Sequence, residues 1–257
     1  MSNYSNIEWC NCTWNPATGC TKVSKACKNC YMFKEALRLQ WMENIRYING
    51  HEPTMHWDLI DLPRSWKKPR NIFVCSMSDL FHDEYPLEFI QSVFKTMNET
   101  PQHIYRVLTK RSPRLAEIAD ELTWSDNIWI GVSVEDRKVY SRIDDLRKVQ
   151  SNNRWLSIEP LLDSVSDIDL TDIRWAVVGG ESGPDSRPMK IEWVREIRDL
   201  CEEKDIAFFF KQYGKDFNNP DMFDDTMYKK IDETKNPLYA KGGCLLDGKI
   251  YQNYPNN

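Results

Sequence analysis

The stretch NIFVCSMSDLFHDEYPLEFIQSVFKTMNETPQHIYRVL, residues 71–108, is the most informative part of the sequence for the fold. It begins with the apolar run 71–75 and ends with a second strand-like run at 104–108. Between these runs, apolar residues recur at helical spacing over 87–97, which predicts an amphipathic helix. A strand, a helix and a strand in this order predict a right-handed βαβ unit with parallel strands.

The same alternation continues toward the C-terminus. Further strands are predicted at 128–132, 154–158, 174–178 and 207–210, and further helices from about Pro113, over 138–149 and over 191–204. With a short strand before Cys20, about seven strands result. We therefore expect an α/β fold, a partial or complete (β/α) barrel rather than a two-layer domain.

Two segments flank this alternation. Near the N-terminus, five apolar residues recur every three or four positions and predict an amphipathic helix directly after Cys30: Phe33, Leu37, Trp41, Ile45 and Ile48. Near the C-terminus, 218–236 is polar and predicts a surface excursion. Asp247-Gly248 between apolar pairs then predicts a small hairpin. The expected organisation is one domain, with a barrel at 1–214 that contains a loop at 13–31, and a C-terminal extension at 215–257.

Polar side chains follow almost every predicted strand. The clusters lie at 76–79, 109–111, 133–136, 159–160, 179–183 and 211–212. In βα barrels the active site is built from the loops at the C-terminal ends of the strands, so these clusters are expected to converge on one site. The alternative is that strand ends are polar because they meet solvent. Glu159 favours convergence, since it stands between Ile158 and Leu161 and precedes a proline.

Three of the eight cysteines, Cys20, Cys27 and Cys30, lie in one short loop. Three thiolates can hold three irons of a four-iron cluster and leave the fourth iron open to a small molecule. Closed structural sites use four protein ligands instead. This loop therefore indicates chemistry rather than stability.

The alternative for these cysteines is a structural zinc site with a fourth ligand from Cys10, Cys12, His51 or His56. Zinc sites often use paired Cys-x-x-Cys elements, and only one such pair is present, which favours the cluster. Alternate residues of an extended segment point to opposite faces, so Cys10 and Cys12 are expected to be core or spare thiols. The scattered cysteines Cys75, Cys201 and Cys244 are expected to be packing residues.

The composition and the overall sequence pattern favour a cytoplasmic protein. The 257-residue chain has no run of 18 apolar residues and no signal-peptide pattern at its N-terminus. Clustered cysteines in a reducing compartment are more often metal ligands than disulfides. The net charge of −5 does not attract polyanions to the molecule as a whole, so a nucleic-acid partner would need a local basic patch.

Several motifs, in order along nearly the whole chain, resemble one known family. They are IEW (7–9), TWNP (13–16), GC (19–20), CKNCY (27–31), SMSDLFH (76–82), LTKR (108–111), GVSVED (131–136), LSIEP (156–160), VVGGESG (177–183), FFKQ (209–212) and LDG (246–248). Together they resemble the phage-type three-Cys-motif proteins, which are regarded as relatives of radical S-adenosylmethionine (SAM) enzymes.

This resemblance implies a radical SAM-type barrel with a [4Fe-4S] cluster on Cys20, Cys27 and Cys30. The amino and carboxylate groups of SAM would chelate the open iron. An electron from a donor such as flavodoxin or ferredoxin would cleave SAM to methionine and a 5′-deoxyadenosyl radical, which abstracts hydrogen from a substrate. The cysteine spacing departs from the usual radical SAM pattern, because six residues rather than three separate the first two cysteines.

Candidates for binding SAM are the polar and glycine residues at the strand ends: Ser76, Ser78, Asp79, Lys110, Glu135, Glu159, Gly179, Gly180 and Glu181. Carboxylates suit the amine and ribose hydroxyls of SAM. Lys110 is either a cation for the SAM carboxylate or a substrate phosphate, or part of a solvated rim. Gly179-Gly180-Glu181 comes later than the similarly spelled radical SAM motif, so by position the serines and Asp79 fit methionine binding better. No residue is assigned to the catalytic step.

The substrate prediction is a nucleobase or nucleotide, in DNA modification or phage–host conflict. It rests on the phage association of the family and on its relation to spore photoproduct lyase. Arg64, Lys67, Lys68 and Arg70 around Trp66 suit a nucleic-acid backbone with a stacked base, or are simply a solvated loop. The alternative function is a zinc- or cluster-containing nucleic-acid-binding or regulatory protein that does not cleave SAM.

Overall fold

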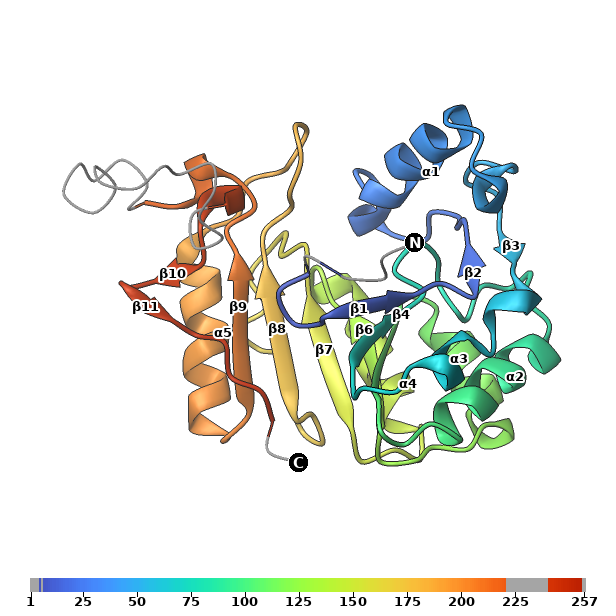
Figure 1. Cartoon of the computed structure of the whole chain (residues 1–257). Coiled ribbons are helices and arrows are strands. Elements are labelled where there is room, and N and C mark those ends of the chain that lie inside the picture. Colours follow the sequence, from blue (N-terminus) through green and yellow to red (C-terminus); the bar gives the residue numbers. More distant parts are fainter. Residues whose placement is uncertain (1–4, 6, 221–239, 256–257) are drawn as a thin grey trace. The chain divides into compact units, whose positions relative to one another are not determined.

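The computed structural model describes residues 5, 7–220 and 240–255 (Figure 1). Its contacts divide the chain into two compact units. Unit 1 comprises Met1–Val132 and Ser141–Arg154, and unit 2 comprises Ser133–Tyr140 and Trp155–Asn257.

Unit 1 is built on four parallel strands in the order β1-β4-β5-β6. The strands are β1 (Cys12–Trp14), β4 (Asn71–Val74), β5 (Ile104–Thr109) and β6 (Ile128–Ser133), and the helices that follow the last three are α2 (Leu87–Asn98), α3 (Ser112–Ile118) and α4 (Ser141–Arg147). The predicted strands and the parallel pairing are confirmed. The helix expected over 138–149 is shorter, because a 3-10 turn, η6 (Arg137–Val139), precedes α4.

Helix α2 shows why the periodicity of 87–97 was informative. It begins after Pro86, whose fixed φ suits a helix start. Its buried residues repeat at helical spacing and face the sheet: Phe89, Ile90, Val93, Phe94, Thr96 and Met97. The expected apolar face is therefore the face that the core uses.

The N-terminal segment of unit 1 differs from the prediction. Helix α1 (Tyr31–Trp41) ends eleven residues after it begins, and Glu43 then adopts a positive φ of 56°. Asn44 caps a separate 3-10 helix, η2 (Ile45–Tyr47). The prediction of one helix from Cys30 to Ile48 is therefore wrong, because the chain turns between α1 and η2.

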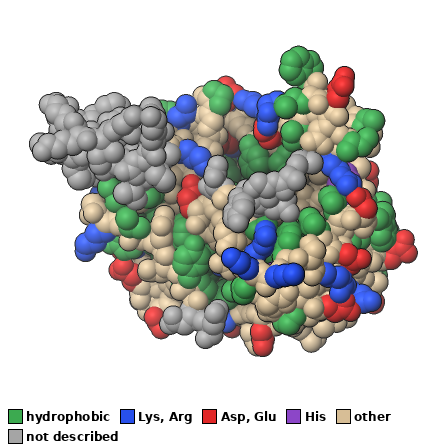
Figure 2. All heavy atoms as spheres, viewed as in Figure 1, with side chains coloured by type: hydrophobic (Ala, Val, Ile, Leu, Met, Phe, Trp, Pro, Cys, Tyr) green, Lys and Arg blue, Asp and Glu red, His purple; other side chains and the backbone are tan. Residues whose placement is uncertain are grey.

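The predicted apolar face of this segment is also wrong. The residues that α1 buries are Met32 and Ala36, which pack with Tyr47 and Met77. Most of the expected face is exposed: Leu37 at 50%, Trp41 at 86%, Ile45 at 73% and Ile48 at 64%. Figure 2 shows hydrophobic side chains at the surface in this region. Spacing alone cannot tell which of two adjacent apolar stripes faces the core.

The remaining elements of unit 1 are short. An antiparallel pair, β2 (Ala17–Thr18) and β3 (Thr54–Met55), lies on either side of the cysteine loop in sequence. The loop itself contains the 3-10 helix η1 (Lys25–Cys27). Further 3-10 turns are η3 (Trp57–Leu59), η4 (Leu62–Ser65) and η5 (Ala119–Glu121).

Unit 2 contains three parallel strands in the order β7-β8-β9, namely β7 (Arg154–Ile158), β8 (Trp175–Gly179) and β9 (Ala207–Gln212). Helix α5 (Ile191–Glu203) connects the last two and lies alongside β9 (Figure 1). Strand β8 is buried along its whole length, as expected for a strand covered on both faces.

The predicted C-terminal hairpin is confirmed as β10 (Leu245–Leu246) and β11 (Lys249–Ile250). Arg195 and Arg198 of α5 both bind the carboxylate of Asp247 in its turn, at 2.6 and 2.7 Å. After the hairpin the chain runs antiparallel to β9, with Gln252 opposite Phe209, and covers the edge of that strand. The other short turns are η7 (Asp216–Asn218) and η8 (Ala240–Gly242).

The described residues thus contain seven parallel strands, the number expected from the sequence. Helices follow β4, β5, β6 and β8, and the strands form the partial (β/α) barrel that was one of the two predicted forms. The predicted surface excursion at 218–236 lies almost entirely outside the described residues. Within the described residues, no helix combines the length and apolar character needed to cross a bilayer.

Candidate functional site

The cysteine loop begins at Gly19, where only glycine fits. Its φ is +80°, and a Cβ at this position would lie 2.1 Å from the carbonyl oxygen of Glu52. Its N–H donates to the carbonyl of Met77 (2.9 Å), and its own carbonyl accepts from the Ser78 hydroxyl (2.6 Å). The predicted site residue Ser78 therefore holds the start of the loop.

The three cysteines of the loop are free thiols. Cys27 is buried, and Cys20 and Cys30 are half-buried against the core that α1 covers. Burial, together with the neighbouring Asp79 carboxylate, raises the pKa of the Cys20 thiol to about 12. Burial also raises the pKa of Cys30, and nearby Lys110 opposes that effect. The charges of Cys27 and Cys30 act on the Cys20 thiol, and the charge of Cys27 acts on the Cys30 thiol.

These residues fit a cluster with three protein ligands. The thiols share one loop, and cations that offset thiolate charge lie near them. Among the residues that the structure describes, no three or more His, Cys, Asp or Glu side chains are arranged to hold a single metal ion. In a four-iron cluster each thiolate binds a different iron, so the sulfurs need not converge on one point.

Three of the four proposed fourth zinc ligands are engaged elsewhere, whereas the backbone carbonyl of His51 accepts from the N–H of Cys20 (2.9 Å). The Cys10 thiol donates to the Ser5 hydroxyl (3.4 Å), and Arg70 donates to the sulfur of Cys12 (3.4 Å). The His56 ring lies 2.9 Å from the Thr18 hydroxyl. Cys10 and Cys12 are buried. So are the three scattered cysteines, as expected for packing residues: Cys75, Cys201 and Cys244.

Asp79 joins the ends of strands β4 and β5. Its carboxylate accepts from the Thr109 hydroxyl (2.7 Å), from the N–H of Lys110 (3.0 Å) and from the N–H of Phe81 (3.1 Å). Nearby, the Ser76 hydroxyl donates to the side-chain oxygen of Asn15 (3.1 Å). The structure therefore brings the serines, Asp79 and Lys110 together in the same unit as the three cysteines.

Sequence reasoning missed the residues that hold Thr21, next to Cys20. Arg111 donates to the Thr21 hydroxyl at 2.6 Å, and the His82 ring lies 2.8 Å from the same oxygen. Arg111 is 8% exposed and His82 is 2% exposed. The signal was present in the sequence, because these residues end the motifs LTKR and SMSDLFH.

In unit 2, Glu159 is the centre of a polar group at the ends of its strands. Its carboxylate accepts from the Lys211 ammonium (2.8 Å) and from the amide of Gln212 (3.2 Å), which also donates to the Gly180 carbonyl (3.2 Å). A Cβ on Gly179 would lie 3.4 Å from the Glu159 carboxylate. Lys211 and Gln212 belong to a polar cluster noted in the sequence, but neither was predicted as a site residue.

Glu181 is buried and binds Arg187 through both the backbone and the guanidinium. The N–H and Nε of Arg187 donate to Glu181 at 2.9 and 2.8 Å. This hydrogen bonding raises the pKa of Arg187, and the nearby carboxylate of Glu135 adds to the effect. Glu135, Glu159, Gly179, Gly180 and Glu181 thus all lie in unit 2. Their convergence with the cysteine loop on one site stays a prediction.

The basic segment around Trp66 does not offer a ring for base stacking. Trp66 is 8% exposed, and the guanidinium of Arg70 lies over its ring at 4.4 Å. Arg64 forms ion pairs with Asp61 and Glu99. The stacking hypothesis at Trp66 is therefore wrong, because packing already covers the ring.

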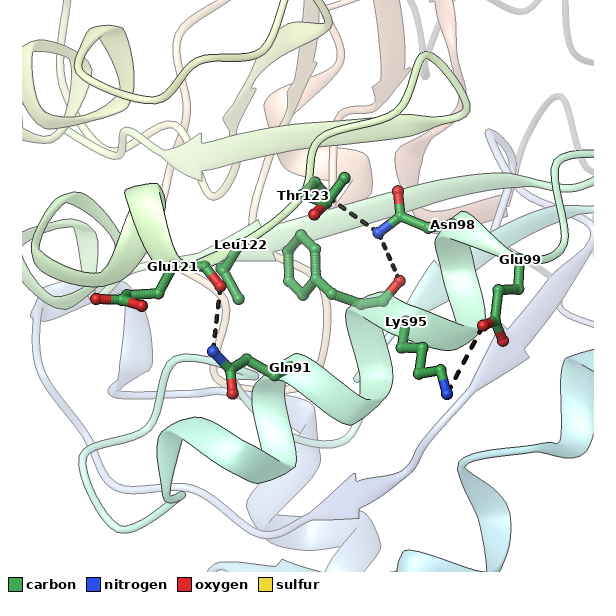
Figure 3. A pocket seen from close by; sticks show the side chains of 8 residues that line it. Gln91, Lys95, Asn98, Glu99, Glu121, Leu122 and Thr123 are labelled. Carbon is green, nitrogen blue, oxygen red and sulfur yellow. Dashed lines mark hydrogen bonds and ion pairs between the residues drawn. The ribbon is translucent and has the colours of Figure 1, made fainter.

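A cavity between α2 and the segment 121–123 carries no comparable chemistry (Figure 3). Its polar groups hold the walls together: Gln91 donates to the Glu121 carbonyl (3.2 Å) and Asn98 to the Thr123 carbonyl (3.0 Å). Lys95 lies 3.7 Å from Glu99. We therefore interpret this cavity as a gap in the packing of unit 1.

Comparison with solved structures shows the fold. A tyrosine-to-phenylalanine variant of spore photoproduct lyase is 10% identical over 83% of this chain and 79% of its own, with a TM-score of 0.57. A cysteine-to-serine variant of the same enzyme gives 11% identity over the same shares, with a TM-score of 0.55. A double variant with bound AdoMet and dinucleoside spore photoproduct gives 11% identity over 79% of this chain and 77% of its own, with a TM-score of 0.52. The partial barrel of this chain therefore has the fold of these spore photoproduct lyase structures.

Sequence comparison adds a family. The profile of the family described as "Protein of unknown function (DUF5131)" matches residues 4–255. No curated protein matches this chain.

Proposed function

We propose that this chain, which belongs to the DUF5131 family, is a radical SAM enzyme with a [4Fe-4S] cluster on Cys20, Cys27 and Cys30. The observation that carries this proposal is a loop of three free, mutually close thiols on a radical SAM-type partial barrel. When bound, the cluster would pass one electron to SAM and cleave it to methionine and a 5′-deoxyadenosyl radical.

The residues around the loop suit a bound SAM. Lys110 lies near Cys30 and offers a cation to the carboxylate of the methionine moiety. Ser76 and Ser78 place hydroxyls beside the loop, and Asp79 organises the backbone at Lys110. In unit 2, the carboxylates of Glu135, Glu159 and Glu181 and the backbone at Gly179 and Gly180 would receive the amine, the ribose or the substrate.

For the substrate we propose a nucleobase or nucleotide, in DNA modification or in phage–host conflict. One structural neighbour holds a dinucleoside spore photoproduct, and the motifs resemble the phage-type three-Cys-motif proteins. We further propose an electron donor such as flavodoxin or ferredoxin. The free thiols suit the reducing cytoplasm. We treat 1–214 with 215–257 as one functional domain.

Anaerobic reconstitution with iron and sulfide, followed by reduction in the presence of SAM, tests the proposal. The expected results are about four irons per chain and formation of 5′-deoxyadenosine, and both should be lost in Cys20→Ala, Cys27→Ala and Cys30→Ala. Cys201→Ala, at a buried cysteine of α5, is the matched control and should keep both. Stoichiometric zinc without iron would contradict the cluster. An intact cluster without 5′-deoxyadenosine would favour a nucleic-acid-binding or regulatory protein.

Alanine variants of Glu159 and Glu181 test the roles proposed in unit 2. Loss of a carboxylate that accepts from SAM should weaken SAM binding roughly tenfold or more, since hydrogen bonds to charged groups contribute about 1.5–3 kcal/mol. Glu117→Ala, at an exposed position of α3, is the control. Wild-type SAM affinity and turnover in both variants would contradict these roles.

A further inference from the structure

Thr21 is held by two side chains that are distant in sequence. The Nη2 of Arg111 donates to its hydroxyl (2.6 Å) and lies 3.4 Å from its carbonyl oxygen. The N–H of Glu84 donates to Nδ1 of His82 (3.2 Å), so the ring proton is on Nε2, which donates to the Thr21 hydroxyl. This oxygen therefore accepts two hydrogen bonds, which uses both of its lone pairs.

Arg111 is itself rigidly placed. Its N–H donates to the Thr109 hydroxyl (2.8 Å), which in turn donates to Asp79. Its Nη1 donates to Asp83 (2.6 Å), whose side chain is 68% exposed. Because an exposed partner is screened by water, Asp83 offsets little of the guanidinium charge. A buried cation thus lies close to Cys20.

We infer that Arg111 is a positioning residue for the cluster: with His82 it fixes the backbone next to Cys20, and its charge sets the reduction potential of a cluster bound there. The inference rests on the proposed function, because it assigns the cluster to Cys20. A backbone that is fixed beforehand loses less entropy when the cluster binds. A fixed positive charge favours the form of the cluster with one more electron and so raises its potential.

Three substitutions separate geometry from charge. Thr21→Val removes the hydroxyl and leaves the charge, Arg111→Lys keeps the charge but loses the forked donor, and Arg111→Gln loses both. The control is Arg114→Gln. Arg114 lies in helix α3, whose N-cap is Arg111, and donates to the Tyr85 carbonyl (2.8 Å).

The first readouts are the rate of iron loss to a chelator and the midpoint potential of the reconstituted cluster, measured by EPR in a mediator-poised titration. Arg111→Gln should lose iron about fivefold to tenfold faster, the effect of one or two hydrogen bonds, and its potential should be more negative. Thr21→Val and Arg111→Lys should also lose iron faster than wild type, but their midpoint potentials should stay near the wild-type value. An unchanged potential in Arg111→Gln, or equal effects in Arg114→Gln, would overturn the inference.

A readout without the cluster keeps this test separate from the proposed function. In the cluster-free full-length protein, backbone hydrogen exchange of residues 19–24 should be faster in Thr21→Val and Arg111→Gln than in wild type, with strands β8 and β9 unchanged. If wild type binds no iron while this difference is found, the proposed function is wrong, but the inference that Arg111 and His82 hold Thr21 in place is supported. Equal exchange rates in wild type and all variants would show that these contacts do not hold the loop backbone, regardless of the results with the cluster.

Discussion

At the scale of single residues, the cysteine loop depends on one glycine. Gly19 combines a left-handed φ with a backbone carbonyl so close that no side chain fits. It connects the loop to Met77 and Ser78 at the end of β4. The position of Cys20 therefore depends on a residue that carries no chemistry of its own.

Gly19→Ala should destabilise the protein by about 3 kcal/mol or more, because backbone strain at positive φ adds to a clash with the backbone carbonyl of Glu52, which already accepts from the Thr54 hydroxyl (2.9 Å). Urea unfolding measures this loss. The matched control is Gly248→Ala, where φ is +73° but no atom lies within 4 Å of the new Cβ. That variant should cost only about 1 kcal/mol. Equal losses in the two variants would show that the close approach at Gly19 is not limiting.

At the scale of elements, α1 shows that a stripe of apolar residues does not by itself predict which face of a helix is buried. Leu37 and Trp41 lie one turn apart on the helix, yet both are exposed, and the helix buries Met32 and Ala36 instead. The loop that leads into α1 fixes its rotation, since Cys30 is its N-cap and the cysteine loop packs against the same core.

Trp41→Gln and Leu37→Gln should therefore change the free energy of unfolding by no more than about 0.5 kcal/mol, as is usual at exposed positions. Met32→Ala should lower it by about 2–4 kcal/mol, because it leaves a cavity in the core under the cysteines. Denaturant unfolding of the three variants makes the comparison. A large loss in either Gln variant would mean that the exposed stripe is covered in solution.

At the scale of the whole molecule, three buried histidines couple stability to pH. Burial lowers the pKa of His56, His82 and His103 below the usual value near 6.5. Below about pH 6.5 these histidines bind protons in the unfolded chain but stay neutral in the folded protein. The free energy of unfolding is therefore highest above this pH and decreases as the pH falls.

Between pH 7.5 and 5.5 the urea midpoint of the cluster-free protein should therefore decrease, with each histidine contributing at most about 1.4 kcal/mol per pH unit. His103→Gln should make the dependence shallower, whatever its own effect on stability. The slope is the readout, so a variant of lower absolute stability still tests the prediction. A midpoint that is constant over this range would contradict it.

Four features could be predicted from the order of residues alone: the succession of strands and helices, the parallel sheet that follows from it, the C-terminal hairpin and the three-cysteine loop. These features are local: the runs at 71–75 and 104–108, the spacing over 87–97 and the Asp247-Gly248 turn each encode the conformation of their own residues. Patterns of this kind can be read without knowing what packs against them.

The partners of those residues, in contrast, became known only from the folded chain. Arg111 meets Thr21 across 90 positions, and Glu159 meets Lys211 across 52. The buried face of α1 and the covered ring of Trp66 likewise depend on segments far away in the chain. The physical reason is that side-chain pairing and burial are settled by the packing of distant elements, and a local pattern of apolar and polar residues does not specify that packing.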